Sequence, residues 1–263
     1  MIIVKIGGGA SINLEGIVAG LVALSEPLIV VHGANALRNQ LAQQLGIPVQ
    51  TLTSLSGVSS VYSDSPLIDV MMMAYAGLRN KRLVELFQQR QCNAIGLSGL
   101  DGSLISGRRN RGIRVRHNGK IVIRRDFSGK PRAVNLPLIT WLLNHHYVPV
   151  ITVPIRDEMG TAINSENDDI VAVLQEALQA PRVWHFIEAP GILENPRDEH
   201  TVMPSLTPQQ LTRLAEETTG RMHRKIQSLL RLVSQGVEEI VVTDGRVDDP
   251  VSLALNKKGT VIS

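Results

Sequence analysis

A lysine and a run of glycines near the start of the chain are the first residues that suggest chemistry. Lys5 ends an apolar stretch, and Gly7, Gly8 and Gly9 follow it almost at once. Glycines let backbone N–H groups approach phosphate oxygens, a helix N-terminus attracts an anion, and lysine adds a full charge. The spacing matches neither the dinucleotide fingerprint nor the P-loop. The motif predicts a phosphate site, with a plain strand-to-helix turn as the alternative.

Three later stretches could contribute to the same site. His32 and Gly33 stand at a second strand-to-helix junction, where a structural histidine is the alternative. Asn164 and Asp168 precede an apolar helix, which a good N-cap cluster would also explain. Residues 220–225 place arginine and lysine at a helix start, where positive charge opposes the helix dipole. Because this unfavourable charge lowers the local stability of the helix, it favours a functional role, with solvated surface charge as the alternative.

The elements that must position these residues are short apolar strands separated by helices. Continuous apolar stretches occupy residues 1–6, 28–31, 93–97, 148–153, 183–187 and 240–243. Strands that are apolar on both faces indicate a parallel sheet covered by helices on each side. We therefore predict an α/β fold, a three-layer αβα sandwich with a mostly parallel sheet. Residues 1–155 and 156–263 form its two lobes on one continuous sheet, and residues 64–89 form one long helix.

Residues 108–132, named here the basic segment, carry the unbalanced charge of the chain. The segment holds ten Lys and Arg with Asp126 as its only acid, or +9, which leaves 17 basic and 23 acidic residues, or −6, elsewhere. Apolar and polar residues alternate on both sides of Asn118 and Gly119, which predicts a protruding β-hairpin. Such an uneven charge distribution indicates what the protein binds rather than how it folds. The partner could be an acidic protein or a nucleic acid, or the segment could simply be solvated; few aromatic residues make nucleic acid the weaker reading.

Composition excludes several classes of protein. Of the 263 residues, 43% are hydrophobic and 19% are charged, which excludes an intrinsically disordered chain. The single cysteine, Cys92, excludes a disulfide framework and a cysteine-based zinc cluster, and it favours a cytoplasmic location. No run of 18 apolar residues occurs, so no membrane-spanning segment is predicted.

Taken together, the motifs resemble the amino acid kinase superfamily, and within it the N-acetylglutamate kinase branch. The resemblance covers nearly the whole chain and is carried by Lys5 with Gly7 and Gly8, His32 with Gly33, Asn164 with Asp168, and residues 220–225. Residues 96–102 and 128–135 look most like kinases that act on α-aminoadipate or glutamate attached to an acidic amino-group carrier protein, in lysine or arginine synthesis. The resemblance implies a carbamate kinase-like fold, ATP with Mg²⁺, and a homodimer.

The resemblance also implies a role for each matched residue. Such kinases transfer the γ-phosphoryl group of ATP to a side-chain carboxylate, and Lys5, Lys225 and Asp168 would be catalytic. ATP and its phosphates would contact Gly7, Gly8, Gly33, Glu188 and Gly191, with the first three offering backbone N–H groups. The acceptor would contact Gly33, Ala34, Ser59 and Asn164. The carrier protein would contact Arg108, Arg109, Arg111, Arg114, Arg116, Arg124 and Arg125. Mg²⁺ would bridge phosphate oxygens, with no protein ligand assigned.

One departure from the family pattern concerns the acceptor. Relatives carry an arginine at the position of Ser59 that grips the acceptor's α-carboxylate, and serine cannot form that bidentate pair. Either another arginine substitutes or the acceptor differs. Two alternatives therefore stay open: a kinase of a free small molecule such as N-acetylglutamate, and a non-catalytic nucleotide- or carrier-binding protein.

Overall fold

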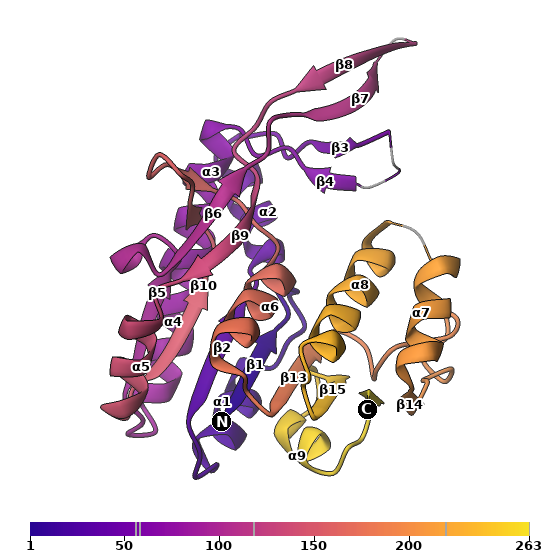
Figure 1. Ribbon diagram of the computed structural model, residues 1–263. Coiled ribbons are helices and arrows are strands. Elements are labelled where there is room, and N and C mark those ends of the chain that lie inside the picture. Colours follow the sequence, from indigo (N-terminus) through magenta and orange to yellow (C-terminus); the bar gives the residue numbers. More distant parts are fainter. Residues whose placement is uncertain (56, 58, 118, 219, 263) are drawn as a thin grey trace.

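One mostly parallel sheet runs through the molecule (Figure 1). The computed structural model describes residues 1–262 except 56, 58, 118 and 219. The sheet has eight strands in the order β14 (Ser205–Leu206), β16 (Thr260–Ile262), β15 (Glu239–Asp244), β13 (Arg182–Ile187), β1 (Ile2–Ile6), β2 (Leu28–His32), β10 (Val148–Thr152) and β5 (Ala94–Ser98). Within this sheet, as far as the structure describes the chain, β15 and β16 form the antiparallel pair and the other neighbours are parallel. Strands from the first and last thirds of the chain thus meet at β1 and β13.

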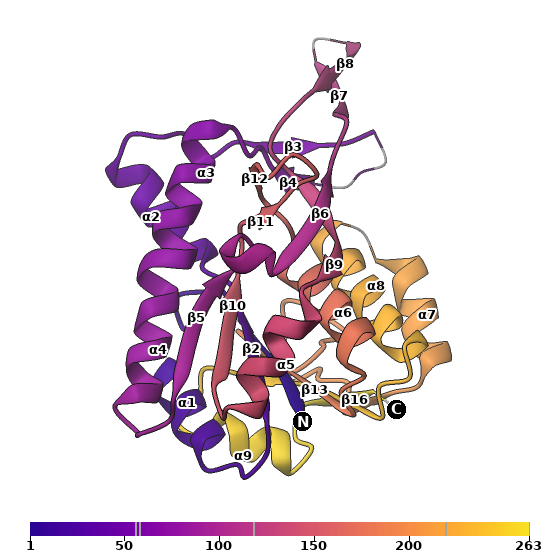
Figure 2. The same cartoon turned by 60° about the vertical axis from the view of Figure 1, so that its left-hand side comes forward.

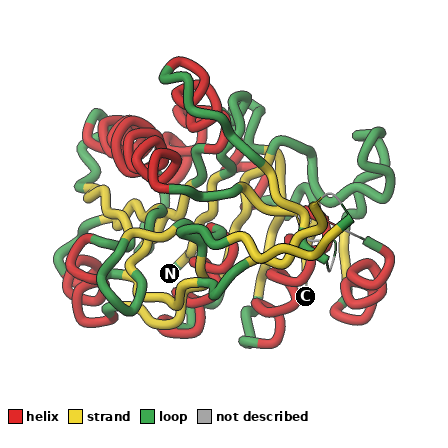
Figure 3. Tube along the Cα trace, turned by 90° about the horizontal axis from the view of Figure 1, so that it is seen from above, coloured by secondary structure: helices red, strands yellow, loops and turns green. Residues whose placement is uncertain are grey.

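Helices cover both faces of this sheet, as Figure 3 shows from above. One face carries α5 (Leu136–Asn144), α6 (Asn167–Leu178) and α8 (Gly220–Ser234), with α7 (Pro208–Glu217) against α8. The other face carries α1 (Leu14–Val22), α4 (Asn80–Gln88) and α9 (Pro250–Leu255). The predicted αβα sandwich with a mostly parallel sheet is confirmed.

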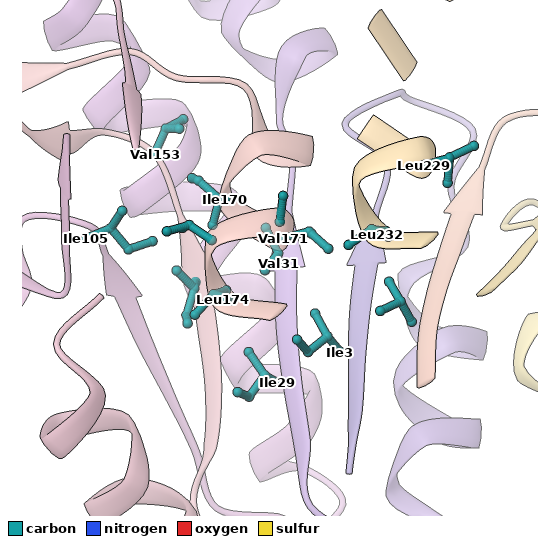
Figure 4. Close-up of a cluster of buried hydrophobic side chains, with 14 of the residues drawn as sticks. Ile3, Ile29, Val31, Ile105, Val153, Ile170, Val171, Leu174, Leu229 and Leu232 are labelled. Atoms are coloured by element: carbon teal, nitrogen blue, oxygen red, sulfur yellow. The ribbon is translucent and has the colours of Figure 1, made fainter. Parts of the chain in front are cut away.

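The two-residue period of β1 assigns its side chains to the two cores. Ile3 packs with Ile29 of β2 and with Leu174 of α6, among the residues drawn in Figure 4. Ile2, Val4 and Ile6 point to the opposite core. Lys5 therefore shares the face of Ile3, beneath α6 and α8. On the neighbouring strand β13, the same alternation puts His185 on this face, because Val183 belongs to the Ile3 core.

A second layer of strands rises above the carboxyl edge of the main sheet. A four-stranded sheet has the order β12 (Ala162–Ile163), β11 (Ile155–Arg156), β6 (Ile105–Arg109) and β9 (Gly129–Val134). The predicted hairpin is present as β7 (Ile113–His117) and β8 (Lys120–Arg124), although Asn118 of its turn lies outside the described residues. It projects beside a second hairpin, β3 (Thr51–Thr53) and β4 (Ser59–Val61) (Figures 1 and 2).

The stretch predicted as one helix over 64–89 is a continuous helical run, but its middle is a π-helix. It consists of α3 (Ser65–Met71), a π-helix η1 (Met72–Arg79) and α4. The helix α2 (Asn35–Gln44) and a short turn of 3₁₀-helix, η2 (Asp101–Ser103), complete the elements named here. Over the described residues, no helix combines the length and apolar character needed to cross a membrane.

Candidate active site

Three charged residues that are far apart in the sequence meet at the carboxyl end of β1. Lys5 leaves β1 with its Nζ atom 3.0 Å from Oδ1 of Asp168, which lies in the first turn of α6. Lys225 lies in the second turn of α8 and acts on the same carboxylate through its charge. A carboxylate in the first turn of a helix is favoured by the helix dipole. The site therefore holds two cations around one anion.

The mutual electrostatics of this group shift its titration. Burial alone would raise the pKa of Asp168, but the positive charge of Lys5, with smaller contributions from His185 and Lys225, lowers that pKa to about 2. Burial and repulsion by Lys5 lower the pKa of Lys225 to about 8, against the attraction of Asp168. At neutral pH, Asp168 is ionised and Lys225 is still mostly protonated. The arrangement therefore keeps a positive charge on Lys225, although the surroundings make its proton easier to lose than that of an exposed lysine.

His185 is a member of this cluster that the sequence did not reveal. It pairs with Lys5 in the β1–β13 register, is fully buried, and has Nδ1 3.8 Å from Oδ1 of Asp168. Neither ring nitrogen has a hydrogen-bond partner among the residues described. Burial, and then the charge of Lys5, lower its pKa to about 3, so the imidazole is neutral. A neutral ring beside Asp168 fills the floor of the site without adding a third positive charge.

The glycine turns after β1 and β2 lie against each other. A Cβ on Gly8 would fall 2.6 Å from the backbone nitrogen of Ala34, and one on Gly33 would fall 3.0 Å from Cα of Gly8. Only residues without a side chain permit this approach. The N–H of Gly7 donates to Phe186 O at 2.8 Å, and that of Gly33 donates to Ile6 O at 2.9 Å.

These two hydrogen bonds correct one predicted detail. Gly7 and Gly33 were expected to offer their N–H groups to phosphate, but both groups are already used to extend the sheet pairing. Their contribution in this structure is close packing of the two turns, which shapes the surface beside Lys5.

The remaining residues of the predicted ATP site lie on the loop after β13. Glu188 accepts hydrogen bonds from the N–H and hydroxyl of Ser11 through Oε1, at 3.0 and 2.6 Å, and these bonds lower its pKa. It therefore holds the turn that follows the glycines. Gly191 packs against Thr260, whose Oγ1 would lie 2.8 Å from an added Cβ. Arg79, at the end of η1, donates to the carbonyl of Gly7 at 3.5 Å and was not anticipated.

The predicted acceptor residues gather above α6. Asn164 donates through Nδ2 to Ser63 Oγ at 3.0 Å, whereas Ala34 turns its side chain into the core at 1% exposure. Ser59 lies on β4 with its carbonyl oxygen bound by the guanidinium of Arg224. The other arm of Arg224 pairs with Glu166 at 2.6 Å. An arginine from α8 thus stands beside the position where the family pattern expects one.

The basic segment forms a separate cationic surface on β6 to β9. Its predicted carrier contacts are exposed, except that Arg109 is half-buried, with its guanidinium 3.9 Å from the centre of the Phe127 ring. A hollow of about 380 Å³ lies at the base, lined by Arg108, Arg109, Asn110, Arg111, Lys130 and Arg132. The hairpin is anchored, because Leu55 donates its N–H to Arg114 O at 3.0 Å.

Carboxylates, histidines and cysteine do not assemble into a metal-binding group in the part of the chain that the structure describes. Glu188, which lies against Gly9, is bound to Ser11, and Asp168 is paired with Lys5. This donor set suits a cation that arrives bound to phosphate oxygens rather than one held by the protein alone.

Comparison with known proteins relates this geometry to a family. Residues 1–244 match the model described as the amino acid kinase family. A LysW-aminoadipate kinase of Thermus thermophilus is 37% identical over 268 residues, which cover 100% of both chains. One of Deinococcus radiodurans is 36% identical and covers 100% of this chain and 91% of that protein. A LysW-aminoadipate/LysW-glutamate kinase of Sulfolobus acidocaldarius is 27% identical over the full length of both.

Solved structures agree on the fold. The chain aligns over its full length with 59% of N-acetylglutamate synthase from Neisseria gonorrhoeae, with a TM-score of 0.77 and 20% identity. Carbamate kinase from Giardia gives a TM-score of 0.66 at 12% identity, covering 99% of this chain and 97% of that one. These likenesses concern architecture alone.

Proposed function

The chain belongs to the amino acid kinase family, and from this premise we propose that it phosphorylates a carrier-bound amino acid. The reaction transfers the γ-phosphoryl group of ATP to the side-chain carboxylate of L-2-aminoadipate, or of glutamate, and yields an acyl phosphate and ADP. The observation that carries the proposal is the pairing of Lys5 and Lys225 around Asp168 at the carboxyl edge of the sheet.

Such a site needs no general base. The acceptor carboxylate is ionised at neutral pH, so its oxygen attacks the γ-phosphorus directly while the bond to the leaving ADP oxygen breaks. The difficulty is to bring two anions together. Lys5 and Lys225 offset their charge and that of the moving phosphoryl group, from opposite sides of the site. Asp168 holds Lys5 at 3.0 Å and favours the protonated form of Lys225.

Mg²⁺ fits this site as a companion of ATP. When bound, it would neutralise the charge of the phosphate oxygens. The phosphates would supply its ligands, because the carboxylates of Asp168 and Glu188 are already engaged by Lys5 and Ser11. The nucleotide would lie along the turns of Gly7, Gly8 and Gly33 and the loop of Glu188 and Gly191.

The acceptor would lie between Asn164 and Ser59, near Gly33 and Ala34. Arg224 supports this placement, because its guanidinium stands at Ser59 and could replace the arginine that the family pattern expects there. Of the two readings of Ser59, substitution by another arginine is therefore the one we propose.

The basic segment supports an acidic carrier protein as the partner that delivers the substrate. Three similar proteins are named for LysW-bound substrates, and the basic segment, which includes the seven predicted arginines, carries +9 and stands above the acceptor residues. Attraction over this surface would speed encounter with an acidic protein. We place the reaction in lysine synthesis, with arginine synthesis if glutamate is accepted, and in the cytoplasm.

A homodimer through the β5 side is part of the proposal. β5 is an edge strand of the main sheet in the described structure, and an exposed edge invites pairing. Large apolar side chains flank this side, with Met73 at 46% and Trp141 at 52% exposure. Light scattering at micromolar concentration tests this element of the proposal.

A single assay tests the function. ADP release with ATP and Mg²⁺ is compared for carrier-bound aminoadipate, carrier-bound glutamate and free N-acetylglutamate. We expect turnover with a carrier-bound acceptor. Turnover with only free N-acetylglutamate would identify a small-molecule kinase, and no ADP with any acceptor would identify a non-catalytic binding protein.

A further inference from the structure

Asp126, the only acid of the basic segment, is buried at the base of the hairpin with 2% exposure. Its Oδ2 accepts the N–H of Ser63 at 3.1 Å, and its Oδ1 accepts the N–H and hydroxyl of Ser128 at 3.2 and 2.6 Å. Arg109 binds its backbone carbonyl rather than its carboxylate, at 2.8 Å. A buried carboxylate held by three such donors fixes them strongly, because charge-assisted hydrogen bonds are short and directional.

The hydrogen bonds continue from Asp126 into the acceptor region. Ser63, itself fully buried, receives the Nδ2 bond of Asn164 on Oγ at 3.0 Å. Backbone bonds run in parallel: the N–H of Phe127 donates to Ser63 O, and the N–H of Asn164 donates to Phe127 O, both at 2.7 Å. The hairpin base, the end of β4 and the strand before α6 are therefore joined at one point. Asp168 lies only four residues beyond Asn164.

We infer that Asp126 is a positioning residue that fixes Ser63 and Asn164 in the acceptor site relative to a partner docked on the basic segment. This inference rests on the proposed function. An acidic carrier that docks on the arginines presents its attached carboxylate at a distance set by the joint between the hairpin and the acceptor residues. Asp126 sets that distance, because its Oδ2 binds Ser63, which follows β4, while its Oδ1 binds Ser128, which precedes β9.

Asp126→Asn tests the inference with a small change in shape. One of the two acceptor oxygens becomes an NH₂ donor, which faces either the N–H of Ser63 or the donors of Ser128, so the joint opens on one side. With carrier-bound aminoadipate, we expect kcat to fall about tenfold or more, the scale of a misplaced reactant. The Kd of the unloaded carrier and the KM for ATP should stay within about twofold, since the arginines and the phosphate side are untouched.

Asp157→Asn is the matched control. Asp157 is equally buried at 3%, and its Oδ1 accepts the N–H groups of Met159 and Thr161, but it does not contact Ser63 or Asn164. We expect a similar loss of thermal stability with unchanged kcat. If Asp126→Asn leaves kcat equal to that of Asp157→Asn, the inference is wrong.

A second variant covers the case in which Asp126→Asn does not fold. Ser63→Ala keeps the backbone bond to Asp126 and removes only the hydroxyl that Asn164 reaches, so kcat should again fall while carrier Kd is kept. Normal kcat in this variant would overturn the inference. Failure of the proposed function gives a different result, because the unmodified protein would then release no ADP with loaded carrier.

Discussion

At the residue scale, the candidate site depends on one carboxylate placed among three basic side chains. Asp168 from α6 faces Lys5 from β1, His185 from β13 and Lys225 from α8. Two ammonium groups this close repel each other, and the carboxylate offsets that repulsion. The neutral imidazole occupies the remaining side without competing for the carboxylate as a cation. The lysines thus keep Asp168 ionised, and Asp168 in turn favours the protonated form of Lys225.

Replacing either lysine by methionine tests the charge requirement. Lys5→Met and Lys225→Met keep most of the side-chain volume and remove the cation, so kcat should fall about a hundredfold or more, as for loss of one charge stabiliser. The measurement is steady-state ADP release with saturating substrates. Lys257→Met is the control, because Lys257 is exposed and pairs with Glu239 far from the site; its kcat should not change. Near-normal turnover in either site variant would contradict the assignment.

The lowered pKa of Lys225 predicts a pH dependence. Burial and the charge of Lys5 lower this pKa to about 8, so kcat/KM for ATP should decline as the pH rises through about 8, when the ammonium loses its proton. Lys225→Arg should move the decline to higher pH, because arginine stays protonated. An unchanged pH profile in this variant would show that another group titrates.

The same lowered pKa makes stability rise with pH, whereas kcat/KM falls with pH. The pKa of Lys225 is lower in the folded protein, at about 8, than its ordinary 10.5. Between these values the unfolded chain binds more protons, so the contribution of Lys225 to the free energy of unfolding rises with pH. Below about pH 8 the buried charge remains a cost. The residue is therefore kept at the expense of stability, as expected for a functional group.

Residue types and spacing predict part of this cluster and miss the rest for a physical reason. Lys5 and Asp168 stand in short sequence motifs whose residue types alone suggest a functional site. His185 sits inside a buried apolar strand, where a lone histidine carries no signal until the register with β1 is known. Arg224 meets Ser59 across 165 residues of sequence, and only the fold brings them together.

At the scale of elements, the hairpin β7–β8 is the part of the basic segment that extends furthest (Figure 1). Arg114 and Arg116 are exposed on β7, which is tied to the β3–β4 hairpin through Leu55. Reversal of both arginines to glutamate should raise the KM for carrier-bound substrate about tenfold or more at low salt, because repulsion replaces attraction. The KM for ATP should stay the same.

The control for that variant reverses the same amount of charge elsewhere. Arg82 and Arg90 lie on and just after α4, on the far side of the sheet from the acceptor residues. Arg82→Glu with Arg90→Glu changes the net charge equally, so the carrier KM should change much less. Equal effects of the two double variants would mean that net charge, and not the hairpin, attracts the carrier.

A second element, α8, brings Arg224 across to β4. We expect Arg224→Ala to raise the KM for the loaded carrier about tenfold, because charged hydrogen bonds contribute about 1.5–3 kcal/mol. Adding Ser59→Arg to this variant should restore affinity from the β4 side. The exposed Arg213 of α7 provides the control as Arg213→Ala. An unchanged KM for Arg224→Ala would show that other residues recognise the acceptor.

The predicted elements were right where apolar periodicity is strong. The continuous apolar strands and the Asn-Gly hairpin follow directly from sequence pattern. The π-helix η1 within residues 64–89 was missed, because its side chains keep a helical pattern while the backbone widens. The strands β6 and β9 were missed because they carry arginine, lysine and glycine rather than alternating apolar residues.

At the scale of the whole molecule, charge is divided between two surfaces. The basic segment has +9 and the rest of the chain −6, although the net charge is only +3. The segment stands above the acceptor residues, so attraction acts on a partner approaching that side. The acidic remainder repels an acidic carrier from other faces. Charge distribution would therefore direct the proposed carrier as well as attract it.

Salt dependence is the measurement that isolates this effect. The Debye length falls from about 10 Å at 0.1 M to about 3 Å at 1 M ionic strength, so screening removes long-range attraction before it disturbs a buried pair such as Lys5 and Asp168. We expect the KM for loaded carrier to rise steeply with added salt while kcat and the KM for ATP change little. Arg114→Glu with Arg116→Glu should flatten this dependence. If KM for the carrier is independent of salt, the +9 surface does not recruit it, and the chemistry proposed for Lys5 and Lys225 would have to operate without that attraction.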